Sequence, residues 1–169
     1  NEAPWGIIDP DYNDSQHFSA LQMEKLDYFI YRLKEQGIYV AFDVLGLGVR
    51  KFKSGDGVAD YNNIKEGAGG ISFFDKRIIE LSKKFAVDFL SHKNPYTGNS
   101  YLDEPAIAMI EMTNENTLFA DWIRAHFTPY YKDEIKNIWV KWLKDKGLAP
   151  DGDWFSDRRF MFEIEDKYK

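Results

Sequence analysis

IAMIEMTNENT, the stretch at residues 107–117, carries the strongest indication of the fold in this chain. It begins as an apolar run and ends abruptly in Asn114, Glu115 and Asn116. An apolar run of this kind is typical of a strand buried on both faces, as found in parallel sheets covered by helices. Barrel enzymes place their reacting side chains at the carboxyl ends of such strands. The stretch therefore predicts a buried strand that delivers a carboxylate, Glu115, to a position suited to chemistry.

A second buried strand is expected at residues 38–45. It follows a predicted helix over residues 19–36, for which Ser19 is a suitable N-cap and Gly37 a suitable left-handed exit. Another helix, over residues 75–91, separates the two strands. Two strands joined through a crossover helix indicate parallel βαβ architecture.

The two helices are each expected to bury one apolar face, because their apolar residues recur at helical spacing. These faces are Leu26, Phe29, Ile30 and Leu33 in the first helix, and Ile78, Leu81, Phe85 and Phe89 in the second. Residues 46–70 form a long glycine-rich loop, and loops of that length are usually functional or mobile. Further helices are predicted near residues 118–125, over 130–146 with a stop at Gly147, and over 157–169.

The alternation of side chains along the strands places carboxylates on one face only. Asp43 lies on one face of the first strand, and Glu111 and Glu115 share one face of the second. A barrel strand has this pattern when one face packs under helices and the other lines the interior. An open doubly wound sheet produces the same pattern, so both architectures remain open on parity alone.

Composition excludes several classes of function. The formal net charge of −6 argues against a nucleic-acid partner, which favours a basic surface. The chain has no cysteine and therefore no thiolate chemistry, and its three histidines, at 17, 92 and 126, lack ligand spacing. We expect no metal and no cofactor. No apolar run approaches the roughly 18 residues of a membrane span, so no membrane partner is expected.

Five segments together resemble the cellulase-like glycoside hydrolases of clan A, which are retaining enzymes with a TIM-barrel fold. They are LDYFI at 26–30, LKEQGIYV at 33–40, HKNPYTG at 92–98, DEPAIA at 103–108 and IEMTNEN at 110–116. The first two are similar to the helix and third strand of the clan, and the last is similar to its fourth strand, which ends in an Asn-Glu pair. The resemblance implies an α/β fold: an incomplete, partial TIM (β/α)8 barrel with parallel strands and crossover helices.

The resemblance also implies roles for individual residues. Glu115 corresponds to the general acid/base, and Asn114 to the residue that hydrogen-bonds the sugar 2-hydroxyl. Trp5, Tyr101 and Trp122 are further candidate substrate contacts, because an aromatic face suits the C–H-rich face of a pyranose ring. Taken individually, each of these three aromatic residues is more often a core or rim residue. The alternative for the Asn-Glu pair is a polar turn that caps the following helix, which the flanking segments make the less favoured interpretation.

The nucleophile of such an enzyme is not found in this sequence. A retaining pair needs carboxyl groups about 5–5.5 Å apart. Glu111 lies four strand residues before Glu115, roughly 13 Å at about 3.3 Å per residue. A complete barrel takes about 250 residues. Residues 1–169 are therefore interpreted as a single partial catalytic domain, covering roughly the third and fourth βα units and catalytically silent alone.

Two functions of different classes follow from this interpretation. The first is a fragment of a retaining glycoside hydrolase that cleaves O-glycosidic bonds in a β-linked polysaccharide of the glucan or mannan type. The second is a non-catalytic carbohydrate-binding or self-associating α/β module, because unpaired strand edges favour association. The expected partners are a carbohydrate substrate and either the missing part of the barrel or a second copy. The compartment is left open, and a secreted or periplasmic location is what the resemblance implies.

Overall fold

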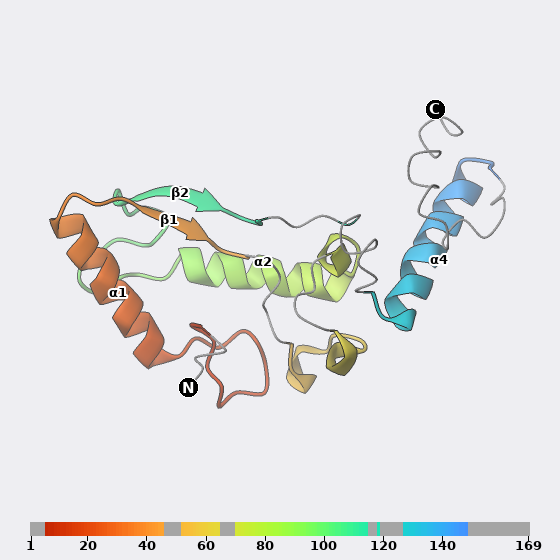
Figure 1. Ribbon diagram of the computed structural model, residues 1–169, viewed down its shortest axis with the longest axis horizontal. Helices are drawn as coiled ribbons and strands as arrows, with labels where there is room; N and C mark the ends of the chain where they lie inside the picture. Colours follow the sequence, from red (N-terminus) through yellow and green to blue (C-terminus); the bar gives the residue numbers. More distant parts are fainter. Residues whose placement is uncertain (1–5, 46–51, 65–69, 115–117, 119–126, 149–169) are drawn as a thin grey trace.

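The computed structural model describes residues 6–45, 52–64, 70–114, 118 and 127–148, and Figure 1 traces the path of the chain. In chain order the elements are α1 (Ala20–Glu35), β1 (Val40–Asp43), three short 3-10 helices η1 (Ser54–Asp56), η2 (Tyr61–Asn63) and η3 (Gly70–Phe73), α2 (Lys76–Leu90), β2 (Ile107–Glu111) and α4 (Pro129–Asp145). Apart from Leu118, the helices predicted near residues 118–125 and over 157–169 lie outside the described residues.

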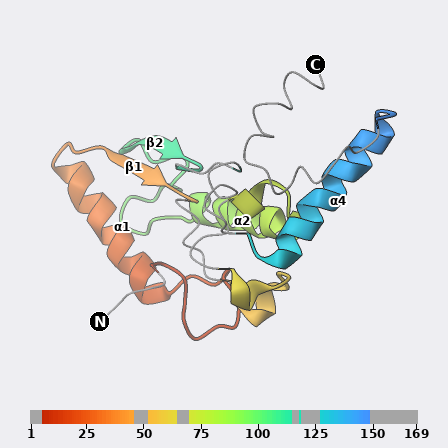
Figure 2. The same ribbon diagram turned by 45° about the vertical axis from the view of Figure 1, so that its right-hand side comes forward.

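β1 and β2 form a parallel pair, which confirms the predicted βαβ unit. Val40 is the register partner of Ile107, and Asp43 is the partner of Glu111, with an irregularity between Val40 and Ala41. Both arrows run in the same direction above α2, with α1 at one end of the molecule and α4 at the other (Figures 1 and 2). The described residues thus form a mixed α/β arrangement around a sheet of two strands.

The helices start and end close to the residues expected from the sequence. α1 starts after Ser19, whose side chain makes no capping hydrogen bond, and ends at Glu35. Gly37 follows with a φ of +69°, the left-handed conformation that glycine adopts without strain. Asp75 caps α2 by accepting a 2.7 Å hydrogen bond from the backbone N–H of Ile78. α4 begins at Pro129, a residue suited to the first helical turn because it has no N–H to leave unpaired.

α2 buries the whole face predicted for it, whereas α1 does so in part, with Ile30 buried and Leu26 and Leu33 half-buried. Ile78, Leu81, Phe85 and Phe89 of α2 are all buried. In α1 the prediction for Phe29 is wrong, because its side chain is 57% exposed. The buried positions of α1 are Met23, Asp27 and Ile30, which have the same helical spacing but include a carboxylate.

Two apolar clusters make up the core, and α2 takes part in both. The first half of α2 packs with the 3-10 helices and the start of α4 in a cluster of buried residues: Phe52, Val58, Ile71, Ile78, Leu81, Phe127, Tyr131 and Ile135. The second half packs with α1 and the strands in the other: Ile8, Met23, Ile30, Val44, Phe85, Ala86, Phe89 and Tyr101. Each fully buried large apolar side chain contributes roughly 2 kcal/mol to stability. Because α2 supplies such side chains to both clusters, it stabilises both regions and links them.

One face of the two-stranded sheet is open among the described residues. Val40 and Phe42 point toward the α1–α2 side, where they pack against the second cluster. On the other face, Tyr39 is 72% exposed and Met109 is 58% exposed, although both are large and apolar. Within the described ranges, no helix is both long and apolar enough to cross a membrane.

Candidate functional site at the strand ends

The carboxyl ends of β1 and β2 meet at one edge of the sheet. The ladder continues past the assigned strands, since the N–H of Val44 donates to Glu111 O at 2.9 Å and that of Leu45 donates to Met112 O at 3.1 Å. Asn114 follows two residues beyond the last of these bonds and is half-buried. The predicted substrate-binding asparagine therefore directly follows a parallel strand.

Three of the predicted site residues, Glu115, Trp5 and Trp122, lie outside the described residues. Their roles as acid/base and as sugar contacts stay predictions.

Asp43 and Glu111 are neighbours on the open face of the sheet. They are register partners on adjacent strands, and both are exposed. This agrees with the parity argument, which places them on the carboxylate face of each strand. Parity could not supply the register that sets them side by side, because register depends on which backbone groups pair. Adjacent strands are about 4.8 Å apart, so the two acidic residues are close neighbours across the pair of strands.

The fifth predicted site residue, Tyr101, is fully buried and does not fit the predicted sugar-stacking role. Its ring packs against Phe42 and Phe89 with centroids 5.3 and 5.1 Å away. Its hydroxyl donates a 2.6 Å hydrogen bond to Asp27 Oδ1. Burial, together with the neighbouring Asp27 carboxylate, raises the pKa of Tyr101 above its usual value. The ring has no free face to offer a sugar, so Tyr101 is a core residue.

Asp27 is the centre of a buried polar network that joins α1 to the segment after α2. Besides Tyr101, its carboxylate contacts His92 Nε2 at 2.8 Å, and its backbone carbonyl accepts from Asn94 Nδ2 at 2.9 Å. The same Asn94 accepts a 2.8 Å bond from the N–H of Tyr96, which closes the turn that the sequence predicts there. The segment HKNPYTG, which carries part of the family resemblance, is thus held by α1.

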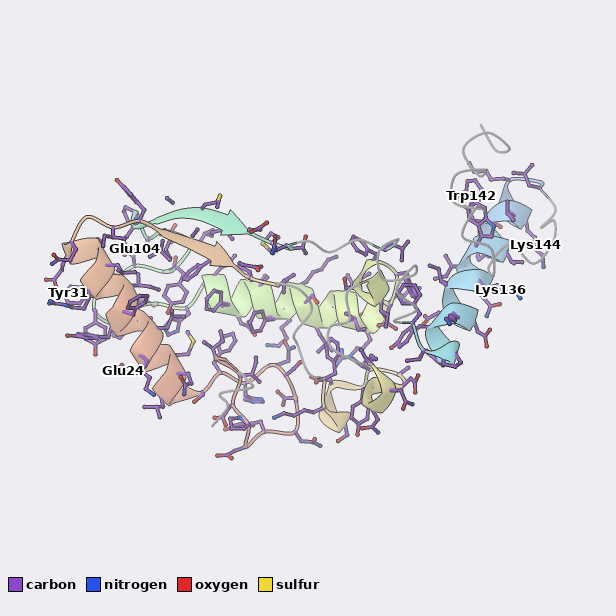
Figure 3. All side chains as sticks on the ribbon, in the orientation of Figure 1. Glu24, Tyr31, Glu104, Lys136, Trp142 and Lys144 are labelled. Carbon is purple, nitrogen blue, oxygen red and sulfur yellow. The ribbon has the colours of Figure 1, made fainter. Side chains whose placement is uncertain are left out.

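The sequence interpretation missed the burial of two carboxylates near the strands, Asp27 and Glu104. Glu104 accepts from Lys34 Nζ at 2.7 Å and from the backbone N–H of Ala106 at 3.0 Å, beside the end of α1 (Figure 3). For Asp27 a signal existed: it lies at helical spacing between Met23 and Ile30 on one face of α1. For Glu104 the signal is absent, because its cation comes from a distant part of the chain.

Comparisons of the chain with protein-family models, with curated proteins and with solved structures found no match. Among the described residues, no group of three or more His, Cys, Asp or Glu side chains is arranged to hold a metal ion.

Proposed function

We propose that this chain is part of a retaining glycoside hydrolase acting on a β-linked polysaccharide, with Glu115 as general acid/base and Asn114 as the ligand of the sugar 2-hydroxyl. One observation supports this above all: β2 is parallel to β1, and Asn114 follows β2 at the edge where both strands end. Barrel glycosidases carry their acid at such a strand end. The barrel itself belongs to the proposal, because the described sheet has two strands.

In this proposal Glu115 acts twice. It first donates a proton to the glycosidic oxygen while a second carboxylate attacks the anomeric carbon and forms a glycosyl ester. It then removes a proton from the water that attacks the ester, and the sugar leaves with its original anomeric configuration. Asn114 donates to the 2-hydroxyl, a contact that strengthens in the transition state.

The nucleophile must come from a strand other than β1 and β2. Glu111 points the same way as Glu115 by parity but lies roughly 13 Å before it, at about 3.3 Å per strand residue. Asp43 is the register partner of Glu111, so the same separation would apply to it if the strand ran extended from Glu111 to Glu115. Neither can form a retaining pair with Glu115, which needs about 5–5.5 Å.

The open face of the sheet favours a second candidate function, a non-catalytic module that binds carbohydrate or associates with other chains. Tyr39 and Met109 are the exposed apolar side chains on that face. Their burial by another chain would be favourable at about 25 cal/mol per Å² of apolar surface. This candidate needs no nucleophile.

The test measures hydrolysis of β-1,4-glucan and β-1,4-mannan oligosaccharides by the 169-residue chain and by the complete gene product. We expect the complete product to hydrolyse one of them with net retention, followed by proton NMR of the released anomer. Glu115→Gln should lower the rate by about 10²–10⁴-fold, the usual contribution of a general acid/base. Azide should restore turnover of an activated aryl glycoside in that variant, because azide replaces water at the anomeric carbon without a general base.

Glu111→Gln is the matched control, since it removes an exposed carboxylate from the same strand, and its rate should stay within a few-fold of the wild type. Equal rates for the wild type and Glu115→Gln would refute the acid/base assignment. If the 169-residue chain alone hydrolysed a substrate, and Glu115→Gln abolished that hydrolysis, the statement that the nucleophile lies outside this chain would be refuted. Absence of hydrolysis by the complete product would favour the non-catalytic module.

A further inference from the structure

A cleft of about 360 Å³ lies between the N-terminal loop, η1 and α2. This volume is at the lower end of the range for small-molecule sites. The cleft is on the side of α2 away from the two strands, where the loop and η1 are drawn below α2 in both views (Figures 1 and 2). The lining side chains that the argument uses are Asp14, Gln16, His17, Arg77, Glu80 and Lys84.

The loop side of the cleft is held in place by Asp14. Its carboxylate accepts 2.8 Å bonds from the backbone N–H of Gln16 and from His17 Nδ1. Burial alone would raise the pKa of Asp14, but these hydrogen bonds outweigh it and hold the pKa below its usual value. The bond to Nδ1 fixes the orientation of the imidazole ring and leaves Nε2 for other partners.

Tyr12 extends this wall with an aromatic surface. Its ring stacks on that of His17, with centroids 3.9 Å apart and planes 11° from parallel, and Tyr12 remains 48% exposed. Tyr12 is next to the cleft through His17, which lines it, and a half-exposed aromatic ring is a suitable platform for an amphipathic ligand.

The floor of the cleft is built around buried Asp56. Its carboxylate accepts from the N–H of Ser15 at 2.9 Å and from that of Lys53 at 2.8 Å, which ties the loop to η1. Its carbonyl accepts a 2.6 Å bond from Arg77 Nε, which ties η1 to α2. Gly55 donates a 2.9 Å bond to Asn13 O. Three segments distant in the sequence are therefore fixed relative to one another before any ligand binds.

The chemistry of the lining favours a neutral ligand rich in hydroxyl groups. Arg77 and Lys84 supply positive charge, and Asp14 and Glu80 supply negative charge, so an anion or a cation alone would meet repulsion from one of the pairs. A hydroxyl group donates and accepts and can satisfy both. The buried Oε1 of Gln16 is one acceptor that receives no hydrogen bond within the described part of the chain.

We propose that this cleft binds one sugar unit of a neutral β-linked oligosaccharide, with the Tyr12 ring against the sugar face and Lys84 and Glu80 on its hydroxyls. It is a second carbohydrate site, on the far side of α2 from the strand ends that carry Asn114. The choice of sugar rests on the proposed function, while the neutral and polyhydroxylated character of the ligand rests on the cleft.

The test is a titration of the 169-residue chain with cellohexaose and with mannohexaose, followed by calorimetry and by amide chemical shifts. Tyr12→Ala and Lys84→Met should each weaken binding of the preferred hexaose by about fivefold or more, as expected for loss of roughly 1 kcal/mol. Tyr28→Ala and Lys83→Met are the matched controls, because Tyr28 is similarly exposed and Lys83 is the neighbouring exposed lysine on α2. The controls should bind like the wild type, and the largest shifts should come from residues 14–17 and 77–84.

Three outcomes would overturn the cleft proposal. They are the absence of binding to both hexaoses, equal weakening by the control variants, and binding that is unchanged in Tyr12→Ala and Lys84→Met. In the last case, a loss of binding in Glu115→Gln would place the sugar at the strand ends, so the cleft would be rejected while the proposed function stands. If the cleft variants lose binding and no gene product hydrolyses the sugars, the cleft proposal survives the failure of the proposed function.

Discussion

Glu104 is the described carboxylate whose ionisation matters most for the fold. Its side chain is buried at the start of β2, where burial alone would raise its pKa. The hydrogen bonds from Lys34, Ala106 and Asn99 outweigh burial and lower the pKa of Glu104 to about 2, from an ordinary value of 4.5. The residue joins the end of α1 to the start of β2, so its charge stabilises the contact between two elements.

We predict that Glu104 makes the chain sensitive to acid. Because its pKa is lower in the folded state, its stabilisation is complete above pH 4.5 and is lost as the pH falls from about 4.5 toward about 2. Glu104→Gln should lower the free energy of unfolding by about 2 kcal/mol at pH 7, and the difference from wild type should shrink by pH 3. Urea denaturation at both pH values measures this.

The exposed Glu35, which pairs with Arg32, provides the control. Glu35→Gln should change the free energy of unfolding by less than about 0.5 kcal/mol, the usual value for a surface pair. A difference between wild type and Glu104→Gln that is the same at pH 7 and pH 3 would contradict the ion-pair explanation.

The sequence predicts the surroundings of single side chains less well than it predicts helices and strands. The alternation of side chains correctly puts Asp43 and Glu111 on one face of the sheet, because strand parity is a local property. The burial of Tyr101 could not be foreseen, since it depends on Asp27, 74 positions away in the sequence. Exposure of a single aromatic ring is decided by tertiary packing, and no local pattern distinguishes a core tyrosine from a sugar platform.

At the scale of elements, caps and glycines decide where structure starts and stops. Gly37 and Gly147 end their helices with φ of +69° and +71°, as the sequence predicts. Phe29 shows where periodicity is insufficient: the stripe of Met23, Asp27 and Ile30 has equal spacing and is the one that is buried. A hydrophobic count cannot reveal that an aspartate will be buried with a histidine and a tyrosine as partners.

Gly55 is required for a different reason, the close approach of η1 to the N-terminal loop. A Cβ at this position would lie 2.1 Å from the backbone oxygen of Asn13. We predict that Gly55→Ala lowers the free energy of unfolding by about 2 kcal/mol or more, because one backbone segment must move. Chemical denaturation followed by circular dichroism measures it.

Gly37→Ala is the comparison for this prediction. No heavy atom lies within 4 Å of a Cβ added at position 37. Gly37→Ala should therefore lower the free energy of unfolding by about 1 kcal/mol, from the left-handed conformation alone. Gly55→Ala should be the more destabilising of the two, and it should also weaken hexaose binding in the cleft. If Gly55→Ala lowered the free energy of unfolding less than Gly37→Ala, the N-terminal loop would move away from the added Cβ with little loss of stability, which would contradict this prediction.

For the whole molecule, the open sheet face is the main feature to explain. The βαβ arrangement follows from local signals. These are two apolar runs, a crossover helix with an N-cap, and the glycine that follows the first helix. The number of strands that complete the sheet does not follow from them, because it depends on pairings outside the βαβ unit. Tyr39 and Met109 are large apolar side chains exposed on this face, and our proposal is that another chain or chain segment covers them.

We predict that the 169-residue chain self-associates through this face. Sedimentation velocity should show that the average mass increases with protein concentration. The increase should occur at about tens of micromolar, as expected for a weak association. Met109→Lys should shift this rise to concentrations about tenfold higher, because a charged side chain on an open strand disfavours pairing.

Val87→Lys is the matched control, since Val87 is 65% exposed on the helix α2 rather than on the sheet. It should associate like the wild type. A wild-type chain that stays monomeric over the whole range, or equal behaviour of the two variants, would contradict an interface on the sheet.

The side-by-side placement of Asp43 and Glu111 restricts what can cover this face. A purely aliphatic layer would strip water from two adjacent negative charges, at a cost of several kcal/mol for each ion. A covering layer that brings a lysine, an arginine or bound solvent to this pair would avoid that cost. A basic residue that faces the midpoint of the two strands is therefore one feature by which a segment that covers β1 and β2 could be recognised.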